Sequence, residues 1–143
     1  MIEIPAPECI DLLRHHDVGR VCLVCDGIPI ALPTSYRLVA DAHAVSIVMR
    51  TRPEGVVSRS LGAASFEIDQ IDVTRGEAWS VLARGELRLL ADQPGDLVLQ
   101  PWAGGRTLWA ALVVGAITGR RIRKDEAFEP IGPRNGFEVD WAV

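Results

Sequence analysis

The pair Asp26-Gly27, which stands between two apolar runs, constrains the fold more than any other feature of this sequence. Asp-Gly is the strongest short-range hairpin signal, since both central residues of a tight two-residue turn adopt positive φ. We therefore predict a strand over residues 20–25 and an antiparallel return strand over residues 28–32. Proline lacks an amide donor, so the return strand is expected to be interrupted or bulged at Pro29 and Pro33.

Four further segments are predicted to be strands, the first three of them from their alternation of apolar and polar residues. These are residues 44–51, 64–68, 78–90 and 107–118. The last of them is apolar on both faces, which is typical of a central or interface strand. Six strands at short intervals, with tight turns between them, indicate a mainly β protein built as a small antiparallel barrel or sandwich.

Helical spacing is confined to two short segments. The first starts near Pro7, carries apolar residues on one face, and is expected to end at Gly19. The second is expected to open at Pro53 and to end at Gly62. The final residues, 128–143, are broken by prolines and glycines and are expected to form a docked tail.

Composition excludes several classes of protein. The 143 residues are 48% hydrophobic and predict one domain over residues 1–143. Because the 15 Lys and Arg residues are outnumbered by 19 Asp and Glu residues, the chain has no excess of positive charge for binding nucleic acid. The longest uncharged apolar stretch, residues 108–118, is too short to cross a membrane, and residues 1–5 do not resemble a secretory leader. A cytoplasmic location is therefore expected.

No metal site or catalytic residue is predicted. Cys22 and Cys25 lie three apart within a predicted strand, so their sulfurs are expected on opposite faces. With Cys9, they are interpreted as buried apolar side chains. The adjacent His15 and His16 diverge by about 100° around a helix and cannot share a metal ion. No Ser-His-Asp spacing or Gly-rich phosphate loop is evident, so the catalytic residues stay unknown.

Two polar constellations are candidate ligand sites. Arg50-Thr51-Arg52-Pro53 joins a predicted strand to a predicted helix start, where free amides and guanidinium groups favour a phosphate. An ordinary turn with surface arginines explains it equally well. Trp79-Ser80 offers a flat apolar surface and a hydroxyl to a planar ligand, although a core tryptophan is the commoner reason for such a residue.

Motifs along the chain give a more specific indication. In order, they are HDVGRV up to Val21, Pro33-Thr34-Ser35-Tyr36, Met49-Arg50-Thr51 followed by Pro53, FEIDQID, WSVLARGEL, PWAGG and ITGRRI. In this order the chain resembles the pyridoxamine 5'-phosphate oxidase-like family of flavin-binding split-barrel proteins. The similarity is greatest to the small actinobacterial-type flavin-nucleotide-binding members.

The resemblance implies a six-stranded antiparallel split β-barrel with a few short helices. It also implies a homodimer that holds FMN at its interface and acts as a flavin-dependent oxidoreductase on an unidentified small molecule. Phosphate contacts are implied for Arg50 and Thr51, and we add Arg52 because it lies two residues from Arg50. Ring or ribityl contacts are implied for Pro33, Thr34, Ser35, Met49 and Ser80, the last often from the second subunit. We assign Trp79, beside Ser80, to the wall of the pocket.

The sequence departs from the family at Val56, where members usually carry a lysine that meets the phosphate. Losing one charge-assisted contact costs about 1.5 to 3 kcal/mol, and Arg52 is the residue expected to replace it. Two alternatives stay open: a dimer that has lost flavin and has no catalytic role, and a reductase that uses deazaflavin. Arg120 and Arg121 are expected to brace the barrel.

Overall fold

The computed structural model describes residues 1–124, and it is mainly β with one helix among those residues. The elements in chain order are β1 (Ile2–Ile4), α1 (Ala6–His15), β2 (Val18–Cys25), β3 (Ile28–Ala40), β4 (Val45–Thr51), β5 (Gly62–Asp72), β6 (Glu77–Leu90) and β7 (Leu108–Arg123). The prediction of six strands was one too low within this range. The additional strand, β1, has three residues, too few to show an alternating pattern.

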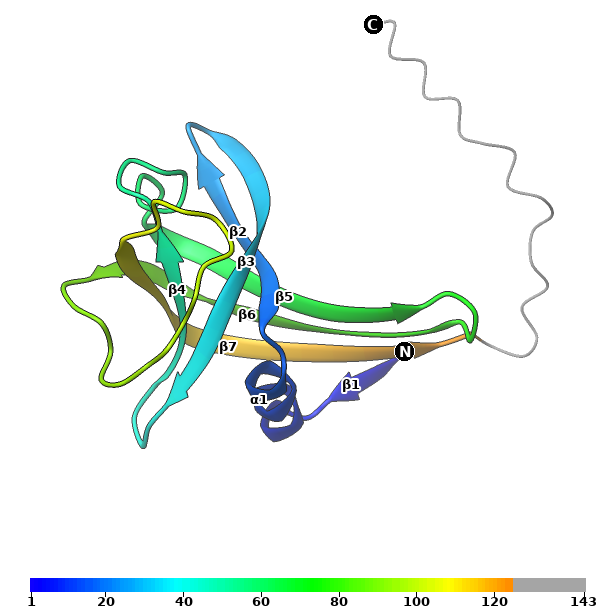
Figure 1. The fold of residues 1–143 in the computed structure, drawn as a ribbon. Helices are drawn as coiled ribbons and strands as arrows, with labels where there is room; N and C mark the ends of the chain where they lie inside the picture. Colours follow the sequence, from blue (N-terminus) through cyan, green and yellow to red (C-terminus); the bar gives the residue numbers. More distant parts are fainter. Residues whose placement is uncertain (125–143) are drawn as a thin grey trace, which may run out of the picture.

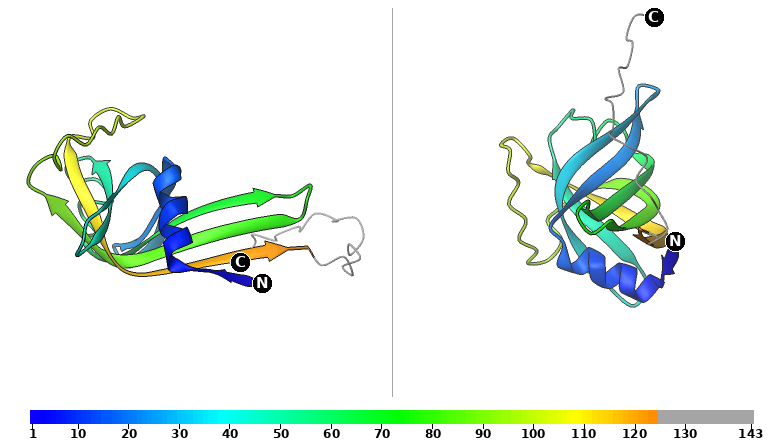
Figure 2. Two further views of the ribbon diagram at one scale, coloured as in Figure 1. Left: turned by 90° about the horizontal axis from the view of Figure 1, so that it is seen from below. Right: turned by 90° about the vertical axis from the view of Figure 1, so that its right-hand side faces the viewer.

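The strands form one antiparallel sheet in the order β1-β7-β4-β3-β2-β5-β6, and pairing between β6 and β7 closes it into a ring. The ring is split because β2 pairs with β5 only from Arg20 to Cys22, opposite Ser65 to Glu67. Beyond that point β5, β6 and β7 continue together and project from the ring (Figures 1 and 2). We call residues 68–72, 77–81 and 119–123 of these strands the arm. The split β-barrel implied by the family resemblance is confirmed.

The predicted hairpin is confirmed, but the predicted break after it is wrong. Asp26 and Gly27 have φ of 52° and 77°, as the tight turn requires. β3 then runs without a bulge and pairs in continuous register with β2. Pro29 and Pro33 are tolerated because β4 pairs with β3 only from Tyr36 onward, which leaves one side of the earlier residues without a neighbouring strand.

The first predicted helix exists but is shorter than expected. α1 ends where His16 turns to extended backbone, and Gly19 belongs to β2. Cys9 and Leu13 are fully buried, and α1 packs against β3, β6 and β7. His15 is exposed, whereas His16 lies at the edge of the core with its ring centroid 5.0 Å from that of Trp79.

The second predicted helix, after Pro53, does not form. Residues 52–61 instead make a series of turns, in which the amide of Gly55 donates to the carbonyl of Arg52 at 3.1 Å. Glu54 has a φ of 57°, a left-handed conformation that a right-handed helix cannot contain. The prediction therefore failed at the second residue of the expected first turn.

The core lies inside the ring and follows the alternation of the strands. Val81 and Ala83 of β6 are fully buried, and Trp79 is half-buried on the same face. β7 pairs with β4 on one side and β6 on the other, which confirms residues 108–118 as part of a central strand. The predicted tail, residues 128–143, lies outside the described residues. No helix within residues 1–124 is long and apolar enough to span a membrane.

Candidate functional site

Strand alternation separates the cofactor residues predicted on β3 and β4 into two groups. The side chains of Thr34, Met49 and Thr51 face the interior and are 8%, 0% and 6% exposed. Their neighbours Pro33 and Arg50 face outward. The side chains available to a ligand on this surface are therefore those of the outward group, which also includes Ser35.

Arg50 is the best-defined member of the outward group. It lies directly opposite Trp109 in the β4–β7 register, and its guanidinium carbon is 4.9 Å from the centroid of the Trp109 ring. This cation–π contact holds the guanidinium against the ring. Its Nε is buried and has no hydrogen-bond partner among the described residues. A buried donor of this kind is costly to leave unpaired.

Arg52 follows Arg50 at the start of the turns. Its backbone carbonyl accepts hydrogen bonds from the Gly55 amide and, at 2.9 Å, from the Ser58 hydroxyl, while its side chain is exposed. A phosphate here would meet arginine side chains and turn amides, without the helix start that the sequence suggested. Val56 is partly buried against the core, so its side chain does not share the outward surface.

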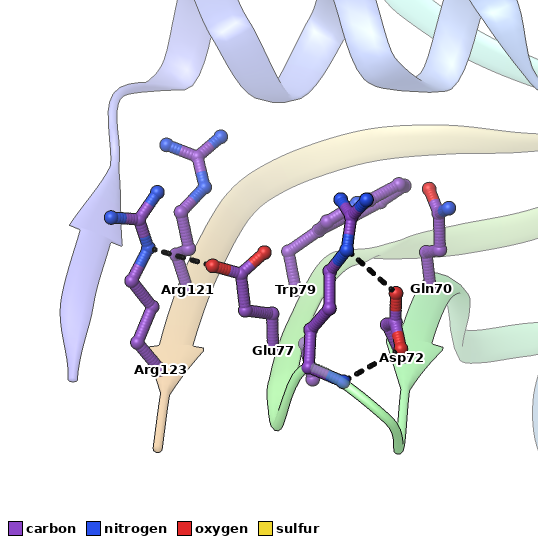
Figure 3. Close-up of a pocket in the computed structure, with 8 residues that line it drawn as sticks. Gln70, Asp72, Glu77, Trp79, Arg121 and Arg123 are labelled. Carbon is purple, nitrogen blue, oxygen red and sulfur yellow. Dashed lines mark hydrogen bonds and ion pairs between the residues drawn. The ribbon is translucent and has the colours of Figure 1, made fainter. Parts of the chain in front are cut away.

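Trp79 and Ser80 do not form one ligand surface, because consecutive residues of a strand face opposite ways. Trp79 lies opposite Gln70 and Arg121, and Ser80 lies opposite Asp69 and Arg120. Trp79 lines a pocket on the arm together with Gln70, Arg121 and Arg123, as Figure 3 shows.

The charged side chains of the arm pocket are joined in ion pairs. Arg123 Nε is 3.4 Å from a Glu77 carboxylate oxygen, and Arg75 Nε is 3.7 Å from one of Asp72 (Figure 3). Arg121 donates to Glu8 at the start of α1 at 2.6 Å. Arg121 thus braces the arm against the helix, whereas Arg120 lies on the opposite face of β7.

The predicted residues therefore fall into two distant groups within one chain. Arg50 is opposite Trp109, and Trp109 is opposite Leu90 near the end of β6. Ser80 lies ten residues earlier on the same strand. At about 3.3 Å per residue, this places it roughly 30 Å from Leu90 along β6. One flavin nucleotide cannot reach both groups on a single copy.

A third cluster lies on the outer face near Pro33. Arg20 is opposite Pro33, and its guanidinium is 3.0 Å from Glu67 and 3.2 Å from Asp69. Burial raises the pKa of Glu67 above its usual value, although its hydrogen bond to Arg20 opposes this shift. Because two carboxylates share the one guanidinium, the cluster has no free cation to offer a phosphate.

The cysteines are free, and Cys22 and Cys25 lie on opposite faces of β2, as predicted. Within residues 1–124, no three His, Cys, Asp or Glu side chains are grouped closely enough to hold a metal ion. Sequence reasoning missed Trp109 as the partner of Arg50. The only local signal was an aromatic residue in an apolar run, and the pairing depends on strand register.

The comparisons agree with this architecture. A family model described as pyridoxamine 5'-phosphate oxidase matches residues 5–121. The chain belongs to this family. No curated protein matches the chain at a significant level.

Solved structures similar to this family member include flavin proteins. The FAD binding protein from Mycobacterium smegmatis is 26% identical, with a TM-score of 0.69, and the match covers 87% of this chain and 100% of that one. A conserved protein of unknown function from Corynebacterium diphtheriae is 19% identical, with a TM-score of 0.72, over 86% and 98% of the two chains. An FAD-binding protein from Mesorhizobium loti is 19% identical, with a TM-score of 0.63, over 85% and 97%.

Proposed function

We propose that this protein is a cytoplasmic flavoprotein that binds FMN on the outer face of β3 and β4 and uses it to oxidise or reduce a small molecule. The observation that carries the proposal is Arg50, held against Trp109 with a buried and unpaired Nε. A phosphate oxygen is the acceptor that a fixed guanidinium fork binds best. Family membership and the flavin-binding neighbours support the same cofactor class.

The residues present fit a flavin nucleotide. Arg50 and the exposed side chain of Arg52 would hold the phosphate, and Ser35 and Pro33 would contact the ribityl chain or ring. Thr34, Met49 and Thr51 would contribute through the backbone and through packing beneath the surface, because their side chains are buried. Val56 leaves phosphate binding to the two arginines.

We further propose that two copies of the chain complete each site. Arg50 and Ser80 of one copy are too far apart to touch the same cofactor, as the length of β6 shows. The arm projects beyond the ring, so it can carry Ser80 to the β3–β4 surface of a second copy (Figure 1). The exposed apolar side chains of Ile71 and Ile122, 65% and 50% exposed, support contact between the arm and another surface.

Bound flavin supplies the redox chemistry, accepting or donating a hydride. The chain's contribution is to orient the ring, to neutralise the phosphate and, once two copies meet, to exclude water from the cleft. No side chain of the described site is placed as a general acid or base. The substrate is accordingly defined here only as a small molecule able to exchange a hydride with flavin.

The test is a titration of the cofactor-free protein with FMN and, in parallel, with riboflavin, which lacks the phosphate. Arg50→Ala is expected to weaken FMN binding about ten- to 100-fold and to change riboflavin binding little, since a charge-assisted hydrogen bond contributes about 1.5 to 3 kcal/mol. Arg84→Ala, which removes an exposed guanidinium from β6, is the matched control and should leave both affinities unchanged.

Two results would contradict the proposal. If wild-type protein fails to bind FMN at millimolar concentration, the ordinary flavin is not its cofactor, and a deazaflavin titration decides between the remaining alternatives. If Arg50→Ala weakens FMN and riboflavin equally, Arg50 does not contact the phosphate. Sedimentation velocity tests whether two copies associate, because the proposal requires a dimer at the protein concentrations where FMN binds.

A further inference from the structure

A small pocket opens on the outer face of the barrel where β5 separates from β2 (Figure 1). It has a volume of about 190 Å³ and is lined by Val18, Gly19, Arg20, Pro33, Ile68 and Asp69. We call it the β2–β5 pocket. At roughly 30 Å³ for each water molecule, its volume corresponds to about six waters, enough for one small polar group. Pro33 belongs both to this pocket and to the surface that the proposed function gives to the flavin.

The charged side chains at the pocket leave an excess of negative charge. Nη1 of Arg20 is 3.0 Å from a carboxylate oxygen of Glu67 and 3.2 Å from one of Asp69, so a single guanidinium nitrogen serves both acids. The two carboxylates are 23% and 29% exposed, which limits the screening of their charge by water. The pKa of Glu67 lies above its usual value because burial raises it and the Asp69 charge adds to the rise, against the hydrogen bond from Arg20.

Other cations on this face do not cancel the excess. Arg37 of β3 is paired with Asp17 at 3.2 Å. Arg120 of β7 lies two strands from Asp69, which is about 10 Å at the spacing of a sheet. Arg84 of β6 lies beyond the end of the cluster that is farther from the pocket. Within residues 1–124, the two acids of the pocket are therefore ion-paired with one guanidinium alone.

We propose that the β2–β5 pocket binds a positively charged nitrogen of the substrate, so that the protein acts on a cationic small molecule without a phosphate. The inference rests on the proposed function, because it takes the position of the flavin from Pro33. An ammonium group donates hydrogen bonds and supplies the positive charge that Glu67 and Asp69 lack. A phosphate in the pocket would meet two carboxylates at short range, which is unfavourable. This substrate class differs from the phosphorylated compound that the family description names.

The experiment titrates the protein with three probes of similar size: benzylamine, benzyl alcohol and benzoate, which are cationic, neutral and anionic at pH 7. With cofactor-free protein, the backbone amide shifts of Gly19 and Asp69 in NMR spectra locate each probe. We expect benzylamine to bind about tenfold more tightly than benzyl alcohol, the lower end for a hydrogen bond to a charged group, because both acids keep some contact with water. Benzoate should bind most weakly.

Two variants test the acids of the pocket. Asp69→Asn and Glu67→Gln should each weaken benzylamine binding about tenfold and change benzyl alcohol binding less than about twofold. Glu86→Gln is the matched control, because it removes the same charge from a 61% exposed side chain of β6 outside the pocket. It should leave the affinities of all three probes unchanged. Thermal unfolding verifies that each variant is folded, and either acid variant alone is sufficient for the test.

The same titration of FMN-loaded protein tests whether the pocket adjoins the flavin. Benzylamine should shift the visible absorbance of bound FMN, and this shift should require higher benzylamine concentrations in Asp69→Asn. If benzylamine moves the pocket amides but leaves the flavin absorbance unchanged, the pocket is not beside the flavin and the inference is wrong.

The remaining outcomes separate this inference from the proposed function. If FMN binds but the three probes bind equally, or benzoate binds most tightly, the inference is wrong and the proposed function stands. If benzylamine is preferred but neither acid variant weakens it, the β2–β5 pocket is not its site, and the inference is also wrong. If benzylamine binds through Asp69 while FMN does not bind wild type, the proposed function fails and a cation site without a role toward flavin remains.

Discussion

Replacing Tyr36 by phenylalanine tests how the helix is held on the barrel. Tyr36 is fully buried, and its hydroxyl donates to the carbonyl of Leu13 at 2.5 Å. Leu13 lies in the last turn of α1, where carbonyl groups have no partner within the helix. The ring of His16 meets the carbonyl of Leu12 in the same turn at 2.7 Å. The Tyr36 hydroxyl thus supplies a donor that this end of the helix requires.

Tyr36→Phe keeps the ring and its edge contact with Phe66 but leaves the Leu13 carbonyl buried without that donor. An unsatisfied buried acceptor costs about 1 to 3 kcal/mol. For a domain of this size we expect the melting temperature to fall by roughly 3 to 9 °C. Urea unfolding followed by circular dichroism at pH 7 measures the free energy difference.

The alkaline pH dependence gives a second measurement. Burial raises the pKa of Tyr36 above its ordinary value of 10 in the folded protein. The resulting stabilisation is complete below pH 10 and is lost as pH rises toward the folded-state pKa, by at most about 1.4 kcal/mol per pH unit. Tyr36 is the only tyrosine in the sequence, so Tyr36→Phe should lack this contribution. Equal stability of the two proteins at pH 7, together with parallel stability curves above pH 10, would refute the reasoning.

Two other substitutions test the backbone. Gly85→Ala should lower the free energy of unfolding by more than about 3 kcal/mol, because a Cβ there would overlap the Val113 carbonyl at the bulge between β6 and β7. Urea unfolding measures the change, and a loss of less than about 1 kcal/mol would contradict the prediction. Glu54→Gly should raise the free energy of unfolding by roughly 0.5 kcal/mol, because glycine adopts the left-handed φ of this position without strain. The urea midpoint should therefore rise, and an unchanged midpoint would contradict the prediction.

Local signals in the sequence were sufficient for most of the sheet. The Asp26-Gly27 turn and the alternation in β4 and β6 depend on neighbouring residues alone, and both were predicted correctly. The alternation of a strand points the Thr34 and Ser35 side chains to opposite faces, although the family resemblance implied cofactor contacts for both. The order of residues did not say which of the two faced inward. That choice depends on which face the ring encloses.

Features set by distant contacts were not predictable from local patterns. The length of β3 depends on β4 being absent beside Pro29 and Pro33, and the turns after Arg52 depend on the conformation of Glu54. The stacking of Arg50 on Trp109 joins residues 59 positions apart through the β4–β7 register. Likewise, the path of roughly 30 Å along β6 from Ser80 to Leu90 depends on one strand continuing from the arm into the ring, at about 3.3 Å per residue.

The length of β6 has a thermodynamic consequence. A ligand that touches Arg50 of one copy and Ser80 of another binds only after the two have associated, so ligand binding and association share one equilibrium. By mass action, cofactor then favours the assembled form, and dilution of the protein releases cofactor even when the free cofactor concentration is constant. If two copies complete the site as proposed, the apparent dissociation constant of the cofactor should rise as the protein is diluted below the dissociation constant of the assembled form. Occupancy would thereby report protein concentration as well as cofactor supply.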